Sequence, residues 1–301
     1  MALIVYWYDF ICFGIVLAAI VASLWFLLRR ERGCIDVGVM VAQNSLLLMS
    51  RSESESLGSV RLWASCWRRL HPGWILFTRS ISFLSMTALL AWDLIKWDAS
   101  IFVYYTEWTF MLVMIYFAVG ILASVYGCLE CSKEPTLENA VVDNVEDEFR
   151  QRLGVYGCFM QTIFQTSAGA VVLTDVVFWL LIVPFQSNSH LGLNMLMICM
   201  HTANAGFLLI DTVLNRLPFP WFRMGYFVIW SCLYIVFQWI IHACGFAWWP
   251  YPFLELDRPW APLWYLCMAI AHIPCYGAYA AIVKAKNTFF PYLFPNAFVI
   301  T

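Results

Sequence analysis

Charged side chains are scarce in this sequence. Asp, Glu, Lys and Arg together make up 12 % of its 301 residues, whereas a soluble domain carries about 25 %. Apolar residues reach 62 %, and the mean hydropathy is +0.74. This balance excludes a soluble globular domain, and it equally excludes an intrinsically disordered chain, which is poor in apolar residues.

An excess of charge of either sign is lacking as well. The formal net charge is −2 at pH 7, so we expect no nucleic-acid partner. The apolar residues form long unbroken runs and not short alternating segments, which excludes a transmembrane β-barrel. The remaining fold class is an all-α polytopic membrane protein.

Seven apolar segments have the length that a spanning helix needs, about 20 residues. The second segment is the weakest because it contains Arg79 and Asp93, so six spans is the alternative count. The sequence predicts a helical bundle of seven transmembrane spans, with these segments at residues 10–28, 73–95, 101–126, 160–184, 193–213, 222–244 and 260–283.

Basic residues in the loops predict the orientation of the chain. Of the 17 Lys and Arg, 14 fall in the loops and tail on one side of the predicted bundle. Lys and Arg concentrate in cytosolic loops, so we expect an exoplasmic N-terminus and a cytosolic C-terminus, in the endoplasmic reticulum or the plasma membrane. The predicted divisions are an N-terminal anchor (1–28), a flexible cytosolic loop (29–72), a six-span membrane core (73–283) and a cytosolic tail (284–301).

Cysteines are frequent but scattered, 11 in all. Cys128 and Cys131 form a lone Cys-x-x-Cys pair, and only Cys158 lies near it in the sequence. A structural zinc site needs four ligands. We therefore expect no metal site and no cofactor.

Polar residues recur at helical spacing inside four of the predicted spans. Ionisable groups are costly in a bilayer and by default point to function, although interhelical hydrogen bonding is the alternative. Similar faces in the third, fourth and sixth spans contain Thr106, Asp175 and His242. The fifth span carries the longest face, spaced +7, +3, +7 and +4: Asn194, His201, Asn204, Asp211 and Asn215.

Depth within the spans selects a smaller group. At about 1.5 Å per residue, Thr106, His201 and Asp175 lie roughly 8, 12 and 14 Å from the exoplasmic ends of their segments. A threonine hydroxyl becomes a nucleophile when a base within hydrogen-bond reach takes its proton, and a neutral histidine oriented by a third group is a suitable base. An apolar pocket around them would accept acyl chains from the bilayer, so the reaction would be ester hydrolysis.

Three further residues are candidate supports for this pair. His272 lies roughly 18 Å deep in the last span, His242 lies near the rim of the sixth, and Asn204 shares the face of His201. Asp211 lies near the cytosolic end of its span, where we expect it to fix helix packing. The loop at 248–257 is rich in aromatic residues and proline, which is typical of an interfacial aromatic belt or of a lid over the polar cavity.

Three strings also carry a family resemblance: Tyr-Tyr-Thr-Glu-Trp-Thr at 104–109, Met-His-Thr at 200–202 and Trp-Pro-Tyr-Pro-Phe-Leu-Glu at 249–255. Together they resemble the androgen-induced gene 1 / androgen-dependent TFPI-regulating protein family. They resemble more closely the uncharacterised plant transmembrane proteins related to that family and to the rolling-stone proteins. The resemblance covers about residues 73–283, six spans.

The resemblance implies an activity and its residues. Animal androgen-induced members are intramembrane threonine hydrolases that act on fatty acid esters of hydroxy fatty acids. It therefore implies that Thr106 is the nucleophile, that His201 is its base, and that the substrate is a fatty-acyl ester. This chain departs from the pattern by an added N-terminal span and by a second hydroxyl, Thr109, one turn along.

Other functional classes stay open at this point. The rolling-stone relatives are linked to cell fusion, so a non-catalytic membrane scaffold or interaction protein is the main alternative. A seven-span receptor would carry an acidic-Arg-aromatic triplet after its third span and Asn-Pro-x-x-Tyr in its last, and neither is present. A transporter would show repeat symmetry or paired broken helices. We expect membrane lipids as partners, and the sequence leaves the oligomeric state open.

Overall fold

The structure is a computed structural model that describes residues 6–48, 65–68, 70–131, 143–186 and 195–299. Within these ranges seven helices are long and apolar enough to cross a membrane. The predicted all-α bundle and its count of seven spans are thereby confirmed, and the six-span alternative is dropped. The spanning helices are α1 Trp7–Leu48, α2 Pro72–Trp97, α3 Tyr105–Cys131, α4 Asp143–Val177, α6 Met195–Leu214, α7 Met224–Ala243 and α8 Ala261–Leu293.

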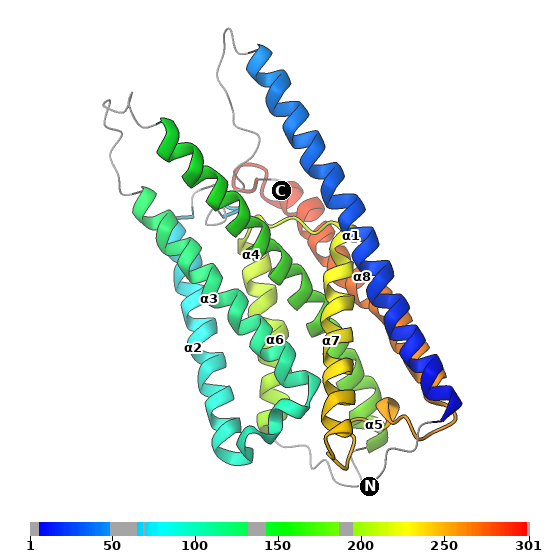
Figure 1. The fold of residues 1–301 in the computed structure, drawn as a ribbon. Coiled ribbons are helices and arrows are strands. Elements are labelled where there is room, and N and C mark those ends of the chain that lie inside the picture. The colour runs from blue at the N-terminus through cyan, green and yellow to red at the C-terminus, as the bar shows by residue number, and fades with distance from the viewer. Residues whose placement is uncertain (1–5, 49–64, 69, 132–142, 187–194, 300–301) are drawn as a thin grey trace.

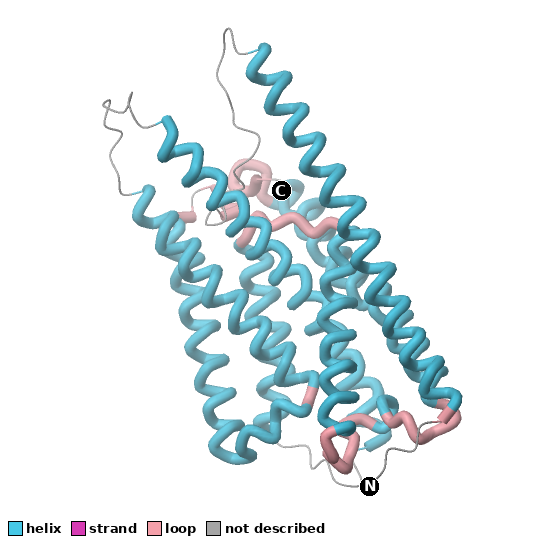
Figure 2. The backbone as a smooth tube through the Cα atoms, in the orientation of Figure 1, coloured by secondary structure: helices cyan, strands magenta, loops and turns pink. Residues whose placement is uncertain are grey.

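The long helices run alongside one another, and the two chain termini lie at opposite ends of the bundle (Figures 1 and 2). We call the end that carries Trp7 the N-side and the opposite end the C-side. α4 packs against α3, α6, α7 and α8, whereas α1 packs against α7 and α8 and α2 against α3 and α6. Short elements join them: η1 Asp98–Val103, the π-helical turn η2 Phe178–Ile182, α5 Val183–Gln186, η3 Trp221–Arg223 and η4 Pro252–Leu254.

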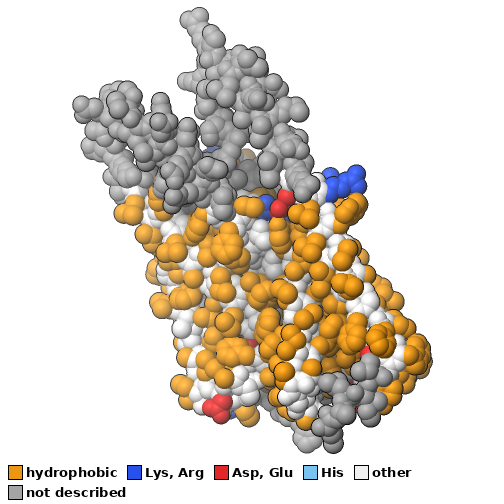
Figure 3. Space-filling view, in the orientation of Figure 1, with side chains coloured by type: hydrophobic (Ala, Val, Ile, Leu, Met, Phe, Trp, Pro, Cys, Tyr) orange, Lys and Arg blue, Asp and Glu red, His pale blue; other side chains and the backbone are white. Residues whose placement is uncertain are grey.

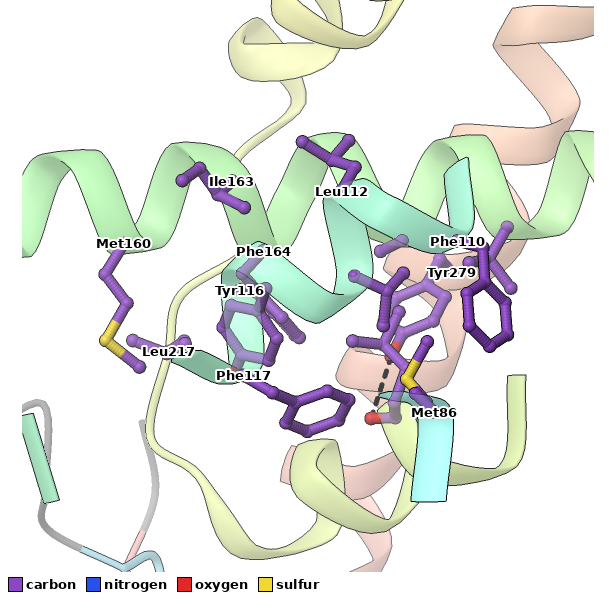
Figure 4. Close-up of a cluster of buried hydrophobic side chains, with 14 of the residues drawn as sticks. Met86, Phe110, Leu112, Tyr116, Phe117, Met160, Ile163, Phe164, Leu217 and Tyr279 are labelled. Carbon is purple, nitrogen blue, oxygen red and sulfur yellow. Dashed lines mark hydrogen bonds between the residues drawn. The ribbon is translucent and has the colours of Figure 1, made fainter. Parts of the chain in front are cut away.

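On the face that Figure 3 shows, apolar side chains cover the bundle, and the exposed charged side chains lie near its two ends. In the interior, helices pack through large apolar and aromatic side chains (Figure 4). Gly169 allows α4 and α7 to approach, because a Cβ there would lie 2.6 Å from Cδ1 of Phe227. Close packing of this kind replaces the hydrophobic driving force that helices lack inside a bilayer. The largest buried side chains in this core include Phe110, Tyr116, Phe117, Phe164, Met86 and Met160.

Three helices continue beyond the segments that hydropathy delimits. α1 runs to Leu48, inside the stretch 29–72 that the sequence predicts as a flexible loop, and α4 begins at Asp143. α8 runs to Leu293, so the predicted tail at 284–301 begins as helix. In it, the Lys286 ammonium donates to the carbonyls of Thr212 and Asn215 at 3.1 and 3.0 Å. A helix ends where its ladder of backbone hydrogen bonds ends, and not where the chain leaves the bilayer.

The start of α3 also differs from the prediction. Hydropathy places it at Ile101, but the chain first forms η1 and enters α3 only at Tyr105. The Val103 carbonyl accepts hydrogen bonds from the Tyr234 hydroxyl at 2.8 Å and the Gln238 amide at 2.7 Å. Those two residues lie roughly 8–13 Å from the N-side end of α7. α3 therefore begins inside the bundle, and Thr106 lies deeper than counting along the sequence predicts.

A buried group of charged and polar residues joins α2, α3 and α6 toward the C-side. We call Arg79, Asp211, Tyr116 and Asn215 the arginine cluster. Arg79 is 0 % exposed and its Nε donates to Asp211 at 2.8 Å. The Tyr116 hydroxyl and the Asn215 amide also donate to the Asp211 carboxylate. Asp211 thus has the interhelical partners that its expected role in helix packing requires. One of these partners, Arg79, is a charge that weakened the second predicted span.

Candidate functional site

A cavity lies between α3, α4, α7, α8 and the loop that contains η4. It encloses about 560 Å³ of space that no atom fills, part of it open to the surroundings. Its wall is mostly apolar, and the apolar residues include Leu173, Val177, Phe178, Ile182, Ile235, Phe253, Leu254 and Met268. Its polar residues are Tyr105, Thr106, Thr174, Ser231, Tyr234, Tyr251 and His272.

Thr106 is the second residue of α3 and lines this cavity. The backbone of Tyr104 before the helix is extended, with φ −87° and ψ 140°, so the helix starts sharply there. The backbone N–H groups of the first turn have no acceptor within a helix. Tyr251 lines the same cavity from the loop between α7 and α8, and burial raises its pKa to about 12.

His272 lines the same cavity from α8 and is 6 % exposed. Its Nδ1 lies 2.7 Å from the Met268 carbonyl, which can only accept a hydrogen bond. Nδ1 therefore carries the proton in the neutral imidazole, and Nε2 keeps a free lone pair. Within the described ranges Nε2 is buried without a hydrogen-bond partner. The arrangement gives a base with its tautomer set by the helix itself.

His201 lies one aromatic ring away from the cavity. Its Nδ1 is 3.0 Å from Oδ1 of Asp175. The sequence predicts this contact between the histidine and its orienting carboxylate. Its imidazole stacks on the ring of Phe178, with centroids 3.7 Å apart and planes at 13°. Phe178 lines the cavity, whereas His201 is not among the described residues that do. The lining of the cavity thus includes both Thr106 and His272, whereas His201 pairs with Asp175 and stacks on Phe178.

Phe178 opens the π-helical turn η2 in the helix that carries Asp175. π-Helical turns are rare and are frequent at functional sites. The turn follows α4 directly and precedes Pro184. Its first residue, Phe178, lines the cavity and stacks on the His201 imidazole.

The two remaining predicted supports have different surroundings. His242 anchors the loop after α7: its ring nitrogens face the carbonyls of Gln238 at 2.7 Å and Trp248 at 3.1 Å, and it stacks on Trp249. Asn204 is buried on α6, and its Oδ1 has no partner within the part of the chain that the structure describes. Neither residue lines the cavity described above.

Sequence patterns missed part of this site. The Tyr105 and Ser231 hydroxyls lie 2.8 Å apart, and the Thr174 hydroxyl donates to Thr109 at 3.3 Å. Thr174 falls off the polar stripe of its helix, so spacing gives no signal for it. The sequence allowed two interpretations of the loop at 248–257, an aromatic belt and a lid over the cavity. Tyr251, Phe253 and Leu254 of this loop line the cavity, which supports the lid.

No family model, no curated protein and no solved structure matches this chain. A function for this protein is therefore inferred from the geometry of the cavity.

Proposed function

We propose that this multi-pass membrane protein is an intramembrane hydrolase of fatty-acyl esters in which the Thr106 hydroxyl is the nucleophile and a histidine is the base. The observation that carries the proposal is that Thr106 and His272 line one largely apolar cavity. Its apolar wall suits an acyl chain, and the hydroxyl and imidazole supply the groups that acyl transfer to water needs. The resemblance in the strings at 104–109 and 200–202 supports the same nucleophile.

Two histidines compete for the role of base. His272 lines the same cavity as Thr106, and its Nε2 holds a free lone pair. His201 is the base that the sequence predicts and has an orienting carboxylate in Asp175, but the Phe178 ring separates it from the cavity. In the conformation that the structure shows, His272 is the proposed catalytic base. His201 acts only if the Phe178 ring turns away.

The reaction follows from these roles. The imidazole takes the Thr106 proton as Oγ1 attacks the ester carbonyl carbon, and a tetrahedral intermediate forms. The intermediate collapses, the C–O bond to the alcohol breaks, and the imidazolium returns the proton to that alcohol. A water molecule then loses a proton to the same imidazole, attacks the acyl-threonine ester and releases a fatty acid, which restores the Thr106 hydroxyl.

The test is hydrolysis of a fluorogenic long-chain acyl ester by the purified full-length protein. Thr106→Ala abolishes turnover, whereas Thr106→Ser retains part of it because a hydroxyl remains. Thr109→Ala is the matched control, since that hydroxyl lies one turn along α3 and pairs with Thr174. His272→Ala lowers the rate by about 10²–10⁴, and adding it to Thr106→Ala costs little more because nucleophile and base act as a unit.

Two outcomes change the proposal. If His201→Ala loses activity and His272→Ala keeps it, His201 is the base and Phe178 moves during turnover. If wild type and Thr106→Ala hydrolyse the ester equally, or no acyl ester is turned over, the chain is a non-catalytic membrane scaffold or interaction protein.

We also propose that the N-terminus is exoplasmic and the C-terminus cytosolic, in the endoplasmic reticulum or the plasma membrane. An odd number of spans such as seven requires the two ends of the chain to lie on opposite sides of a membrane. Basic residues such as Arg29, Arg30 and Arg216 lie at the C-side, and this supports a cytosolic C-side because Lys and Arg concentrate in cytosolic loops. In sealed membranes a tag after Thr301 is protected from external or lumenal protease and a tag before Met1 is digested. The reverse pattern contradicts this orientation.

A further inference from the structure

A buried acceptor atom of the cavity lining has no partner. His272 lines the cavity and is 6 % exposed. Its Nδ1 donates to the Met268 carbonyl, 2.7 Å away, so Nε2 of the neutral imidazole can only accept a hydrogen bond. Nε2 is buried without a partner within the described ranges, and an acceptor left unpaired in this way costs free energy. The group that suits this position is a donor such as an O–H.

A pair of hydroxyls offers the complementary function. The Tyr105 and Ser231 hydroxyls lie 2.8 Å apart, and both residues line the cavity. Their mutual hydrogen bond uses one of their two protons, so the pair can donate the other to an acceptor oxygen. The Phe227 ring packs on the His272 imidazole, with centroids 4.5 Å apart, and Ser231 follows Phe227 by one turn of α7. The hydroxyl pair and the imidazole are therefore close, and a ligand hydroxyl, which donates and accepts, matches both.

The rest of the lining decides the class of ligand. The described residues that line the cavity include no Lys, Arg, Asp or Glu. A charged head group inside the cavity would find no opposite charge there and would be costly to bury. Most of the wall is apolar, with residues such as Ile182, Ile235 and Phe253. The lining therefore favours an uncharged lipid that carries a hydroxyl on a long alkyl chain.

We propose that the cavity binds the hydroxyl of an uncharged long-chain lipid alcohol beside His272, and that this alcohol accepts the acyl group from Thr106 in competition with water. The protein is then an acyltransferase as well as a hydrolase. The inference rests on the proposed function for the acyl-threonine that the alcohol attacks. Binding of the alcohol needs no turnover and can be tested separately.

The transfer step is the reverse of the step that releases the alcohol of an ester substrate. The alcohol gives its proton to Nε2 of His272 as its oxygen attacks the carbonyl carbon of the acyl-threonine. The new C–O bond forms, the C–O bond to Oγ1 of Thr106 breaks, and the imidazolium returns the proton to Oγ1. The products are a lipid ester and the free Thr106 hydroxyl, so the step needs no further reactant.

The first experiment measures binding of radiolabelled 1-hexadecanol and of its methyl ether to the purified full-length protein. Both ligands have the same alkyl chain and an acceptor oxygen, but only the alcohol can donate to Nε2 of His272. His272→Phe keeps a ring and removes this acceptor. We expect the ratio of alcohol affinity to ether affinity to be about ten-fold higher in wild type than in His272→Phe. The same ratio in both proteins overturns the site.

A second variant tests the donor side and keeps the inference testable if His272→Phe fails to fold. The double variant Tyr105→Phe/Ser231→Ala removes both hydroxyls, since either one alone could still donate. We expect it to bind the alcohol and the ether about three-fold more weakly or worse, because both ligands lose a donor. Ser82→Ala is the control: that hydroxyl donates to the Thr78 carbonyl of its own helix, and Ser82 is not among the described residues that line the cavity. Equal affinities in the double variant and Ser82→Ala contradict the role of the hydroxyl pair.

The second experiment looks for the transfer product. The purified protein receives the fluorogenic long-chain acyl ester with increasing amounts of 1-hexadecanol, and mass spectrometry measures the free fatty acid and the hexadecyl ester. We expect the ratio of hexadecyl ester to free acid to rise in proportion to the alcohol concentration, because alcohol and water compete for one acyl-threonine. Thr106→Ala forms neither product. Hexadecyl ester formed equally by Thr106→Ala contradicts transfer through Thr106.

The remaining outcomes separate the two proposals. Free acid without hexadecyl ester at every alcohol concentration overturns the acyl transfer and leaves the hydrolysis in place. If neither product forms, the proposed hydrolysis and the transfer both fail, and the affinity ratio in His272→Phe still decides whether the cavity binds a lipid alcohol.

Discussion

The bundle contains two buried polar regions that are organised in opposite ways. In the arginine cluster, the guanidinium of Arg79 meets the Asp211 carboxylate, and Tyr116 and Asn215 donate to the same carboxylate. In the cavity, Nε2 of His272 is buried and has no hydrogen-bond partner within the described ranges. Buried polar groups in native proteins are normally paired, so those that are not need an explanation.

The difference separates structural from functional polarity. Groups that satisfy one another in a low-dielectric interior hold their helices in register. Groups with spare hydrogen-bonding capacity beside open space are available to a ligand. By this criterion the arginine cluster fixes α2, α3 and α6, whereas the cavity end of α3, with His272, is the place to look for chemistry.

The largest expected effect is on the arginine cluster. Asp211→Ala leaves Arg79 as a buried cation without its carboxylate, which we expect to lower the free energy of unfolding by about 3–5 kcal/mol. The measurement is unfolding of the purified protein by denaturant in micelles. Asp211→Asn is the control that keeps an acceptor while losing the charge, and it should fall between wild type and Asp211→Ala. A change below about 1 kcal/mol in Asp211→Ala would show that this pair does not hold the helices.

An intermediate effect is expected where α4 meets α7 behind the cavity. Gly169→Ala places a Cβ 2.6 Å from the Phe227 ring, so we expect a loss of about 1–3 kcal/mol in unfolding free energy from overpacking. Gly206→Ala is the matched control, because a Cβ there meets nothing within 4 Å and alanine favours the helix by up to about 1 kcal/mol. Equal destabilisation by both variants would contradict the close contact.

The smallest stability effect is expected in the cavity itself. Thr106→Ala and Ser231→Ala each remove one hydroxyl, and interhelical hydrogen bonds in membranes average about 0.6 kcal/mol. We therefore expect unfolding free energies within about 1 kcal/mol of wild type, measured in the same denaturant assay, while Thr106→Ala alone abolishes ester turnover. A loss of stability in Thr106→Ala as large as that in Asp211→Ala would remove the contrast between the two regions.

Spans and polar faces could be predicted because both follow from residues close together in the chain. Helical periodicity alone correctly placed His201, Asn204 and Asp211 in the interior, where each is at most 3 % exposed. The ends of the helices could not be predicted in the same way. α1 and α8 run past the apolar segments because their backbone hydrogen bonds continue, and η1 delays α3 because Val103 is held from α7.

The sequence by itself determined that this chain is a seven-helix membrane protein with a polar interior, since bilayer thickness and helical period act on local stretches of residues. Only the tertiary structure decided which polar groups meet. Arg79 pairs with Asp211 across 132 residues of chain, and His272, and not His201, lines the described cavity together with Thr106. Such choices depend on side-chain directions and helix offsets between distant segments, which no spacing along the sequence records.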